Sequence, residues 1–390
     1  MKIGLFTDTY YPQINGVATS VMMLKNNLEK LGHQVYVFTT TDPNVSEIER
    51  NVYRVRSLPF KSSRRVGIFY DPRLARGIRR LGLDIVHTNT EFPLGIFGRT
   101  ISRELNIPLL HTYHTIYEEY THYIVKLGLL DTIAKSAARR LSQNFCNSAD
   151  KVVAPTNKVK DLLLSYNVYR DIAVIPTGIN LDKYSRNNYS KEELMGIRRS
   201  LGIDEHDKVI LYIGRLSQEK NIDEIINAME IYLKDKIDTK FVIVGNGPNA
   251  DELKTLARKI EDKTIFAGER PWDEIGKYYQ IGDVFVSASQ SETQGLTYIE
   301  ALASGLPVVA KADKCLEGVV VDGINGFTYN STGQFLQYLD NILGNVQFRK
   351  DLSLNAEMSM EKFSDLNFAL NIEKQYKYLI RNGRLFKKVS

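Results

Sequence analysis

The sequence is poor in cysteine: Cys146 and Cys315 are the only two in 390 residues, and they stand far apart. This count excludes a disulfide-rich scaffold and fits a reducing compartment. Long apolar runs are also missing, since no window approaches the roughly 20 apolar residues that a membrane-spanning helix needs. The start, MKIGLFTDTYYP, is interrupted by Asp8, so we do not expect a signal peptide. A cytoplasmic protein is the resulting expectation.

The remaining composition is that of a soluble globular protein, with 43% apolar and 25% charged residues. A chain of 390 residues exceeds one ordinary core and predicts two domains. Short apolar runs alternate with helical stretches in two series, typical of two doubly wound α/β domains that face a cleft. We expect strands at 2–6, 34–40, 52–57, 84–88, 107–112 and 151–156, then at 208–215, 240–247, 264–268, 283–289 and 306–310.

The domain boundary is expected near a polar, Asn- and Lys-rich linker at about 180–207. The prediction is therefore a first domain over 1–178 and a second over 179–362. The last helical stretch, about 363–390, has no strand after it. We expect this stretch to pack back on the first domain.

The positive charge is unevenly spread along the chain. Residues 1–180 hold 23 Lys and Arg against 15 Asp and Glu, whereas the remainder holds 28 against 31. The excess peaks in KSSRRVGIFYDPRLARGIRR (61–80), where apolar residues are interleaved. Such a stretch suits an anionic membrane surface, although a solvated helix face is an equal alternative. No nucleic-acid module accompanies it. The predicted membrane contacts are Arg64, Arg65, Phe69, Arg73, Arg76, Arg79 and Arg80.

Two strand ends carry candidate phosphate ligands. Gly16 lies in NGVATS (15–20), between the first strand and the first helix, where a helix N-terminus attracts an anion. GRLSQEK (214–220) leaves the first strand of the second series, and Arg215 and Lys220 could together neutralise a diphosphate. The alternative for Gly16 is a simple tight turn. The alternative for Arg215 and Lys220 is that they are two surface cations without a ligand. The chain has no Asp-x-Asp pair for a metal, so we expect neither an essential metal nor a bound cofactor.

The stretch SETQGLTYIEALASGLPVVA (291–310) holds two glutamates, Glu292 and Glu300, separated by seven residues. Amides near Gly295 at a helix start can contact phosphate. Glu300 lies about eight residues on, roughly 12 Å if all were helical. The two carboxylates could thus accept hydrogen bonds from a sugar ring and from a ribose, although two glutamates at this spacing can also be accidental.

His114, in HTYHTIYEEYTHY (111–123), is expected at a strand end near the reacting carbon. The three histidines of this stretch do not form a diagnostic metal pattern. A histidine whose hydrogen bonds are satisfied within the first domain is the alternative.

Together these motifs resemble glycosyltransferase family 4, a retaining family with the GT-B fold. SETQGLTYIEALASGLPVV resembles its E-x7-E region, GRLSQEKN its Arg and Lys diphosphate clamp, PQINGVATSV its glycine loop and PTGIN (176–180) its interdomain segment. A narrower similarity, carried by HTNTEFPLG (87–95) and Gln294, is to the bacterial diacylglycerol glucosyltransferases, which make a membrane glycolipid.

The resemblance implies a role for each matching residue. His114 and Glu292 would contact the donor sugar, and Arg215 and Lys220 would bind the diphosphate. The remaining donor contacts would be Gly16, Gly295, Leu296, Thr297 and Glu300, the last at the ribose.

The implied reaction is transfer of glucose from UDP-glucose to 1,2-diacylglycerol with retention, by an enzyme peripheral on the inner face of the cell membrane. The first domain would bind the acceptor and face the membrane, and the second would bind the nucleotide sugar. Alternatives are another acceptor (glucosyl-diacylglycerol, a polyprenyl-linked sugar or a soluble glycan), a non-catalytic nucleotide-sugar sensor, and a sugar-nucleotide epimerase.

Overall fold

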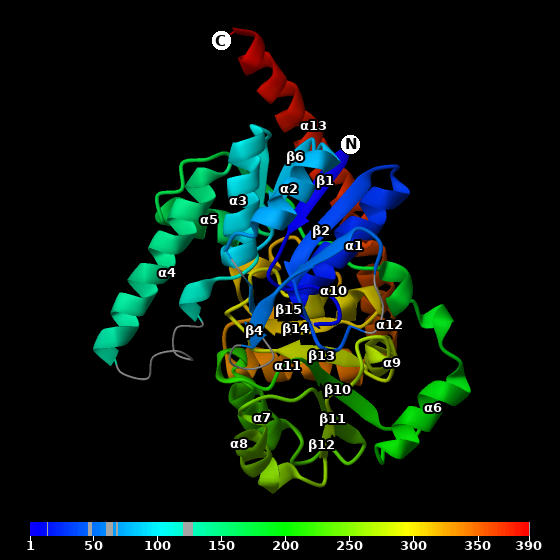
Figure 1. The fold of residues 1–390 in the computed structure, drawn as a ribbon. Helices are drawn as coiled ribbons and strands as arrows, with labels where there is room; N and C mark the ends of the chain where they lie inside the picture. Colours follow the sequence, from blue (N-terminus) through cyan, green and yellow to red (C-terminus); the bar gives the residue numbers. More distant parts are fainter. Residues whose placement is uncertain (14, 46–48, 60–64, 68, 120–127, 390) are drawn as a thin grey trace. The chain divides into compact units, whose positions relative to one another are not determined.

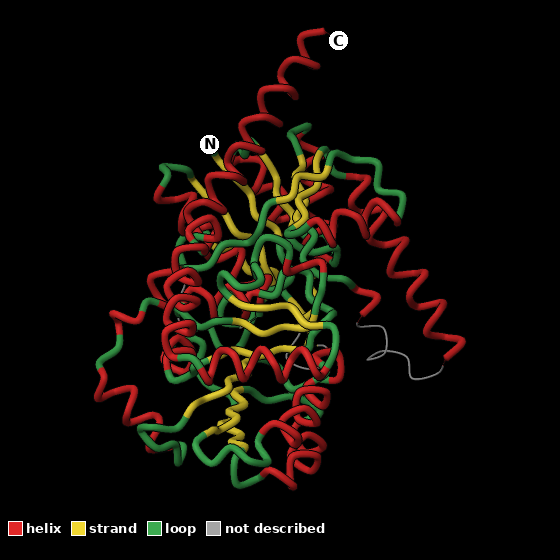
Figure 2. Tube along the Cα trace, turned by 180° about the vertical axis from the view of Figure 1, so that it is seen from behind, coloured by secondary structure: helices red, strands yellow, loops and turns green. Residues whose placement is uncertain are grey.

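The computed structural model describes residues 1–389 except 14, 46–48, 60–64, 68 and 120–127. It forms two compact units, one of Met1–Gly178 with Asp365–Ser390 and the other of Ile179–Ser364. Each unit is built on a parallel sheet flanked by helices (Figure 1). Seen from behind, strands of each sheet again lie among helices (Figure 2). The alternation of strand and helix predicted from the sequence is confirmed.

The sheet of the first unit has the strand order β3-β2-β1-β6-β7-β8-β9, and every pair in it is parallel. The order turns at β1, whose two neighbours are β2 and β6. The strands are β1 (Lys2–Phe6), β2 (Gln34–Thr40), β3 (Val52–Val55), β6 (Ile85–Thr88), β7 (Leu109–Thr112), β8 (Lys151–Ala154) and β9 (Ile172–Val174). A separate antiparallel pair is formed by β4 (Ser57–Pro59) and β5 (Arg65–Gly67).

Alternate side chains of these strands enter opposite layers, because successive residues of a strand point to opposite faces. Ile3 and Leu5 of β1 pack with α1 and α13, whereas Phe6 packs with α2 and α3. The first-unit helices are α1 (Gly16–Lys30), α2 (Pro72–Leu81), α3 (Pro93–Leu105), α4 (Gly128–Ser148), α5 (Asn157–Ser165) and α13 (Asp365–Val389).

The C-terminal helix α13 packs beside α1 on the first sheet (Figure 1). Apart from its apolar residues, a buried polar contact holds it: Nδ1 of His87 lies 2.7 Å from the Tyr376 hydroxyl. Nε2 of the same ring lies 2.7 Å from the Thr112 hydroxyl. Burial lowers the pKa of His87 well below its ordinary value, so the ring is neutral and one nitrogen donates while the other accepts.

The sheet of the second unit has the order β12-β11-β10-β13-β14-β15 and is also parallel throughout. Its turning point is β10, which lies between β11 and β13. The strands are β10 (Lys208–Ile213), β11 (Thr239–Val244), β12 (Thr264–Gly268), β13 (Val284–Ser287), β14 (Val308–Lys311) and β15 (Gly326–Tyr329). Ligands of such sheets bind outside the carboxyl ends of strands near this turning point.

Helices cover both faces of the second sheet. One apolar core joins the sheet to α7, α8 and α11, and the other joins it to α9 and α10. The helices are α6 (Lys191–Ser200), α7 (Ile222–Tyr232), α8 (Ala250–Leu256), α9 (Ile275–Gln280), α10 (Leu296–Ala303), α11 (Thr332–Gly344) and α12 (Val346–Ser359). Short 3₁₀ turns include η2 (Leu181–Tyr184) and η4 (Gln218–Lys220).

Two sequence-based assignments were wrong. The strand expected at 52–57 is two elements, because Val52–Val55 pairs with β2 while Ser57 leaves that sheet and pairs with Gly67. The segment 180–207, which was expected to be a linker, contains the helical elements η2 and α6. The start of α6 was readable from the sequence as a capping box, since the Ser190 side chain accepts a hydrogen bond from the Glu193 amide.

Within the described part of the chain, no helix combines the length and the apolar character needed to cross a bilayer.

Candidate active site

Lys220 and Glu292 form an ion pair at the carboxyl edge of the second sheet. Lys220 ends η4, which follows β10, and Glu292 follows β13. Because β10 and β13 are adjacent in the sheet, their carboxyl ends bring together two residues that are 72 apart in sequence. Nζ of Lys220 lies 2.5 Å from Oε1 of Glu292, and both side chains are largely buried, with 18% and 19% exposed. The Ser289 hydroxyl donates to the same oxygen at 2.9 Å.

The loops that carry this ion pair are fastened to each other by further hydrogen bonds. Nδ2 of Asn221 donates to the carbonyl of Ala288 at 3.2 Å, and the Ser291 hydroxyl donates to the carbonyl of Glu219 at 3.2 Å. Asn221 has a left-handed backbone, with φ of 49°, and begins α7. The position of the Lys220 ammonium is therefore fixed by backbone contacts as well as by its own charge.

Gly295 begins α10 beside Glu292. Its φ is +72°, and a Cβ at this position would lie 2.3 Å from the ring of Tyr298 and 3.5 Å from Cγ of Glu292. The N-cap residue Gly295 has no side chain with which to cap this helix start, and Leu296 and Thr297 form its half-buried first turn. Backbone N–H groups of a first helical turn have no partner within the helix and favour an anion. Lys220, Glu292 and the first turn of α10 thus lie together.

Glu300 lies further along α10, and its carboxylate is contacted by a side chain of α9. Its Oε2 accepts a hydrogen bond from the Tyr279 hydroxyl of α9 at 2.8 Å. Burial raises the pKa of Glu300, while hydrogen bonds from Tyr279 and Tyr184 and the charge of Lys183 act in the opposite direction. The two glutamates therefore differ in their partners, one paired with a cation and the other with phenols.

Arg215 is exposed and lies between β10 and η4. Its carbonyl accepts a hydrogen bond from the Tyr212 hydroxyl at 3.3 Å. The neighbouring turn packs closely on the loop after β11, because a Cβ on Gly245 would lie 1.9 Å from the carbonyl oxygen of Gly214. Gly245 was not among the predicted site residues. Its φ of +140° was not readable from the sequence.

Gly16 is the exposed first residue of α1 in the first unit. The preceding Asn15 caps the helix, since its Oδ1 accepts from the amide of Ala18 at 3.0 Å. Nδ2 of Asn15 donates to the Thr9 hydroxyl at 2.7 Å, which ties the cap to the loop after β1. The predicted glycine therefore lies at a well-formed helix start at the carboxyl end of the central strand.

His114 follows β7 at the same edge of the first sheet. Its Nε2 lies 3.1 Å from Oδ1 of Asn89, which follows β6. Burial, reinforced by His111, lowers the pKa of His114 to about 3, so the imidazole is neutral at physiological pH. Because a carbonyl oxygen accepts at Nε2, the proton is on Nε2 and Nδ1 can accept a hydrogen bond. Asn89 was not predicted as a site residue.

Two buried carboxylates, Glu91 after β6 and Asp8 after β1, were given no role by sequence reasoning. Glu91 accepts from Nε2 of His111 at 3.1 Å and from the Tyr117 hydroxyl. Asp8, after β1, accepts from the Thr90 hydroxyl at 2.5 Å and from the amide of Leu94 at 3.2 Å. Burial raises the pKa of Asp8 to about 6. These bonds fasten the loops after β1, β6 and β7 to one another.

The basic segment is only partly available to a partner. The guanidinium of Arg65 donates to the hydroxyl and the carbonyl of Ser57 at 2.8 and 2.9 Å. Arg79 pairs with Glu104 at 2.7 Å and remains half exposed. Phe69 is 58% exposed. Along α2, Arg73, Arg76 and Arg80 are exposed while Ala75 and Ile78 face the core. Arg64 lies outside the described residues.

Curated relatives match the chain over most of its length. An alpha-monoglucosyldiacylglycerol synthase of Streptococcus pneumoniae is 45% identical over 340 residues, which cover 84% of this chain and 75% of that protein. A protein of the same name from Acholeplasma laidlawii is 36% identical over 402 residues and 100% of both chains. Family models match as well: Glycosyltransferase Family 4 at residues 14–183 and Glycosyl transferases group 1 at residues 196–358.

The chain belongs to glycosyltransferase family 4.

Solved structures agree on the fold of this glycosyltransferase. Sucrose-phosphate synthase from Thermosynechococcus elongatus superposes with a TM-score of 0.78 at 22% identity, covering 98% of this chain and 99% of that one. Anabaena HepE in complex with UDP-glucose gives a TM-score of 0.74 at 19% identity, covering 97% and 100%. The glycosyltransferase has the GT-B fold, as the motifs predicted.

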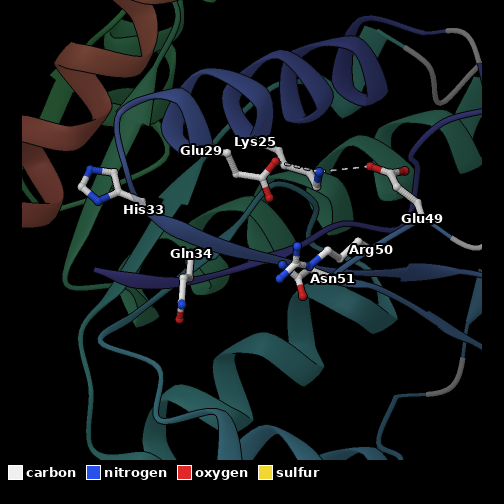
Figure 3. Close-up of a pocket in the computed structure, with 7 residues that line it drawn as sticks. All are labelled: Lys25, Glu29, His33, Gln34, Glu49, Arg50 and Asn51. Carbon is white, nitrogen blue, oxygen red and sulfur yellow. Dashed lines mark hydrogen bonds and ion pairs between the residues drawn. The ribbon is translucent and has the colours of Figure 1, made fainter.

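A cavity of about 330 Å³ in the first unit of the glycosyltransferase has none of the predicted site residues in its lining (Figure 3). Three of its charged side chains are paired with one another, since Nζ of Lys25 lies 3.0 Å from Glu29 and 3.2 Å from Glu49. Its lining reaches the amino ends of β2 and β3, whereas Gly16 and His114 lie at carboxyl ends; the lining residues are Lys25, Glu29, His33, Gln34, Glu49, Arg50 and Asn51.

Among the residues that the model describes, no group of three or more His, Cys, Asp or Glu is placed to hold a metal ion. Metal independence of the glycosyltransferase stays a prediction, and chelation is its test.

Proposed function

We propose that this glycosyltransferase transfers glucose from UDP-glucose to the free hydroxyl of 1,2-diacylglycerol and forms alpha-monoglucosyldiacylglycerol. The observation that carries the proposal is the 45% identity to a protein named for that product, extended by a second relative that matches from end to end. The donor is supported by the UDP-glucose named in the HepE complex. The first unit would bind the acceptor, and the second would bind the nucleotide sugar.

The donor contacts proposed here are those that the family motifs imply, and the geometry of the second unit supports several of them. Lys220 and Arg215 would neutralise the diphosphate together with the N–H groups at Gly295, Leu296 and Thr297. Glu292 would accept hydrogen bonds from hydroxyls of the glucose, and Glu300 would accept them from the ribose. In the first unit, Gly16 would approach the diphosphate and His114 would accept a hydrogen bond near the anomeric carbon.

The chemical step would retain the anomeric configuration through a front-face route. The bond between the anomeric carbon and the β-phosphate oxygen breaks, and the acceptor oxygen bonds to the same face of that carbon. The departing phosphate oxygen takes up the acceptor proton, so charge and atoms balance. Lys220, Arg215 and the α10 amides would stabilise the negative charge that develops on UDP. The neutral His114 ring would not repel the positive charge that builds on the sugar.

The decisive experiment is product analysis with purified protein. UDP-glucose is supplied with vesicles that contain diacylglycerol, and in parallel with glucosyl-diacylglycerol, a polyprenyl-linked sugar or a soluble glycan. We expect a glucosylated diacylglycerol by mass spectrometry, with an α-anomeric proton by NMR. Transfer to one of the other acceptors alone would replace the proposed acceptor. Donor binding without transfer or hydrolysis would instead identify a sensor.

A lipid acceptor requires the enzyme to work at a membrane, and we propose the cytoplasmic face of the cell membrane. We expect α2 to contact anionic lipid. Replacing Arg73, Arg76 and Arg80 by Gln should weaken binding to anionic vesicles about 100-fold, since each basic residue near such a surface contributes about 1 kcal/mol. Sedimentation with vesicles of increasing anionic content and increasing salt measures the effect.

The control removes the same charge elsewhere. Lys254, Arg258 and Lys259 are exposed on the second unit, and their replacement by Gln changes the net charge equally. Vesicle binding should stay within about twofold of the unmodified protein if α2 is the contact. Equal loss in the two triple variants would mean that overall charge, rather than α2, directs the protein to the membrane.

A further inference from the structure

Three elements of the second unit converge on the carboxylate of Glu300. Tyr279 of α9 has no exposed surface, and its hydroxyl lies 2.8 Å from Oε2. Tyr184, at the end of η2, is 2% exposed, and its phenol lowers the pKa of the same carboxylate. The rings of Tyr184 and Tyr279 meet edge to face, with centroids 5.8 Å apart. Each ring therefore restricts the other.

The η2 turn is itself fastened to α9. Nε2 of the buried Gln280 donates to the carbonyl of Tyr184 at 2.8 Å, and it also lies 3.3 Å from the carbonyl of Ser304, just past α10. One amide thus joins all three elements around Glu300. The side chains that meet at the carboxylate cannot move independently.

Lys183, the residue before Tyr184 in η2, supplies positive charge that acts on Glu300. Its Nζ lies 3.1 Å from the centroid of the Trp272 ring and donates to the Trp272 carbonyl. Burial lowers the pKa of Lys183 to about 8, while the charges of Glu300 and Asp273 act in the opposite direction. The ammonium favours the ionised form of Glu300, which accepts hydrogen bonds only.

A carboxylate held in this way is suited to discriminate between hydroxyl-bearing ligands. Tyr279 and Tyr184 use part of its accepting capacity, and its remaining lone pairs have a fixed direction. A ligand hydroxyl placed there gains a charge-assisted hydrogen bond. A ligand that lacks the hydroxyl loses this bond and leaves part of the charged acceptor's capacity unused, which weakens its binding.

We propose that Tyr279 and Tyr184 are positioning residues that aim Glu300 at the donor ribose and make the site select ribonucleotides over deoxyribonucleotides. The inference rests on the proposed function, because it takes Glu300 as the ribose contact of a nucleotide-sugar donor. It adds residues of α9 and η2 to a site that the sequence placed on the loops after β10 and β13.

The test compares UDP with 2′-deoxy-UDP and 3′-deoxy-UDP by isothermal titration calorimetry on the full chain. The unmodified protein should bind UDP about tenfold or more tightly than at least one deoxynucleotide. Tyr279→Phe should lower that ratio about threefold or more by weakening UDP, with the affinity for the rejected deoxynucleotide unchanged. Tyr184→Phe should act in the same direction, which provides a second variant if the first folds poorly.

The matched control is Tyr278→Phe, on the same helix. Tyr278 is also buried, and its ring faces the guanidinium of Arg270 at 5.1 Å, a contact that Phe retains. It should leave the ratio unchanged, so a general effect of removing a phenol from α9 would be visible as a change in this variant too.

The outcomes separate the inference from the function on which it rests. If the unmodified protein binds UDP and discriminates, but Tyr279→Phe and Tyr184→Phe keep the full ratio, the positioning role is wrong while the donor assignment stands. If UDP binds without any discrimination, the ribose assignment of Glu300 is wrong as well. If UDP does not bind, the proposed function itself fails.

Discussion

Lys220→Ala should lower the turnover of glucose transfer about 10²- to 10³-fold, the usual effect of removing one preorganised group that stabilises a developing negative charge. In the folded protein the Lys220 ammonium lies 2.5 Å from Glu292 in a largely buried setting. A cation held there experiences little screening by water and needs no reorganisation when UDP departs. Steady-state kinetics with UDP-glucose, and the affinity for UDP, measure the loss.

Removing Lys220 also leaves Glu292 without its cation, and this second effect needs its own control. Breaking a buried pair is costly because the remaining charge is uncompensated. The double variant Lys220→Ala with Glu292→Gln removes that unpaired charge. We expect it to regain thermal stability relative to Lys220→Ala but not turnover, because the leaving group still lacks its cation.

A lysine variant on the surface provides the control for turnover. Lys236 forms an exposed ion pair with Asp340 at 2.8 Å, and Lys236→Ala should leave turnover within about twofold, since exposed pairs contribute little. Unchanged turnover in Lys220→Ala would contradict the assignment of Lys220 to the leaving group. Activity that is abolished by a chelator and restored by magnesium would contradict it equally, because a metal would then carry that charge.

Gly295→Ala should lower turnover about 100-fold or more and weaken UDP binding by at least about tenfold. Two causes act together at this position. The backbone is left-handed, with φ of +72°, and the new methyl would lie 2.3 Å from the Tyr298 ring. That ring cannot yield, because Tyr298 is fully buried and its hydroxyl lies 2.9 Å from the Ser287 hydroxyl. The loop must therefore shift, and overpacking of this kind costs about 1–3 kcal/mol.

The two causes can be separated with a second glycine. Gly202 has a similar φ of +70°, but a Cβ there would meet nothing within 4 Å. Gly202→Ala should show the backbone strain alone, about 1 kcal/mol of unfolding free energy, with normal turnover. UDP binding can be followed by the fluorescence of Trp272, the single tryptophan, which lies beside Lys183 in the same unit. Equal activity in the two variants would mean that the loop at Gly295 tolerates a side chain and does not approach the phosphates.

Local sequence predicted most elements of the two sheets, because buried parallel strands are short apolar runs and the helices between them have clear start and stop signals. The strands at 2–6, 34–40 and 264–268 have the predicted bounds. The edge strands β9 and β15 were missed, since IAV and GFTY are too short to show a pattern. The segment at 52–57 was misread because nothing in its local pattern marks the point where the chain leaves one sheet for another.

The candidate site also contains some residues that the local sequence predicted and others that it missed. The spacing of Glu292 and Glu300, the glycine between them and the basic residues after β10 were all readable, because they lie within short stretches of chain. Asn89 lies in the HTNTEFPLG stretch but was not singled out, and Tyr279 was missed because a buried tyrosine on a helix reads as part of the core. Their contacts with His114 and Glu300 form only when β6 lies beside β7 and α9 beside α10.

The sequence by itself determined the fold class, the family and the residue types that suit a nucleotide sugar, since these depend on periodicity and on motifs within a few residues. Tertiary structure alone decided which side chains meet. Strand order joins Lys220 to Glu292 across 72 residues and encloses Glu300 between two tyrosines. The physical reason is that pairing in a parallel sheet is set by crossover connections and by the burial of whole layers, neither of which any short stretch of sequence encodes.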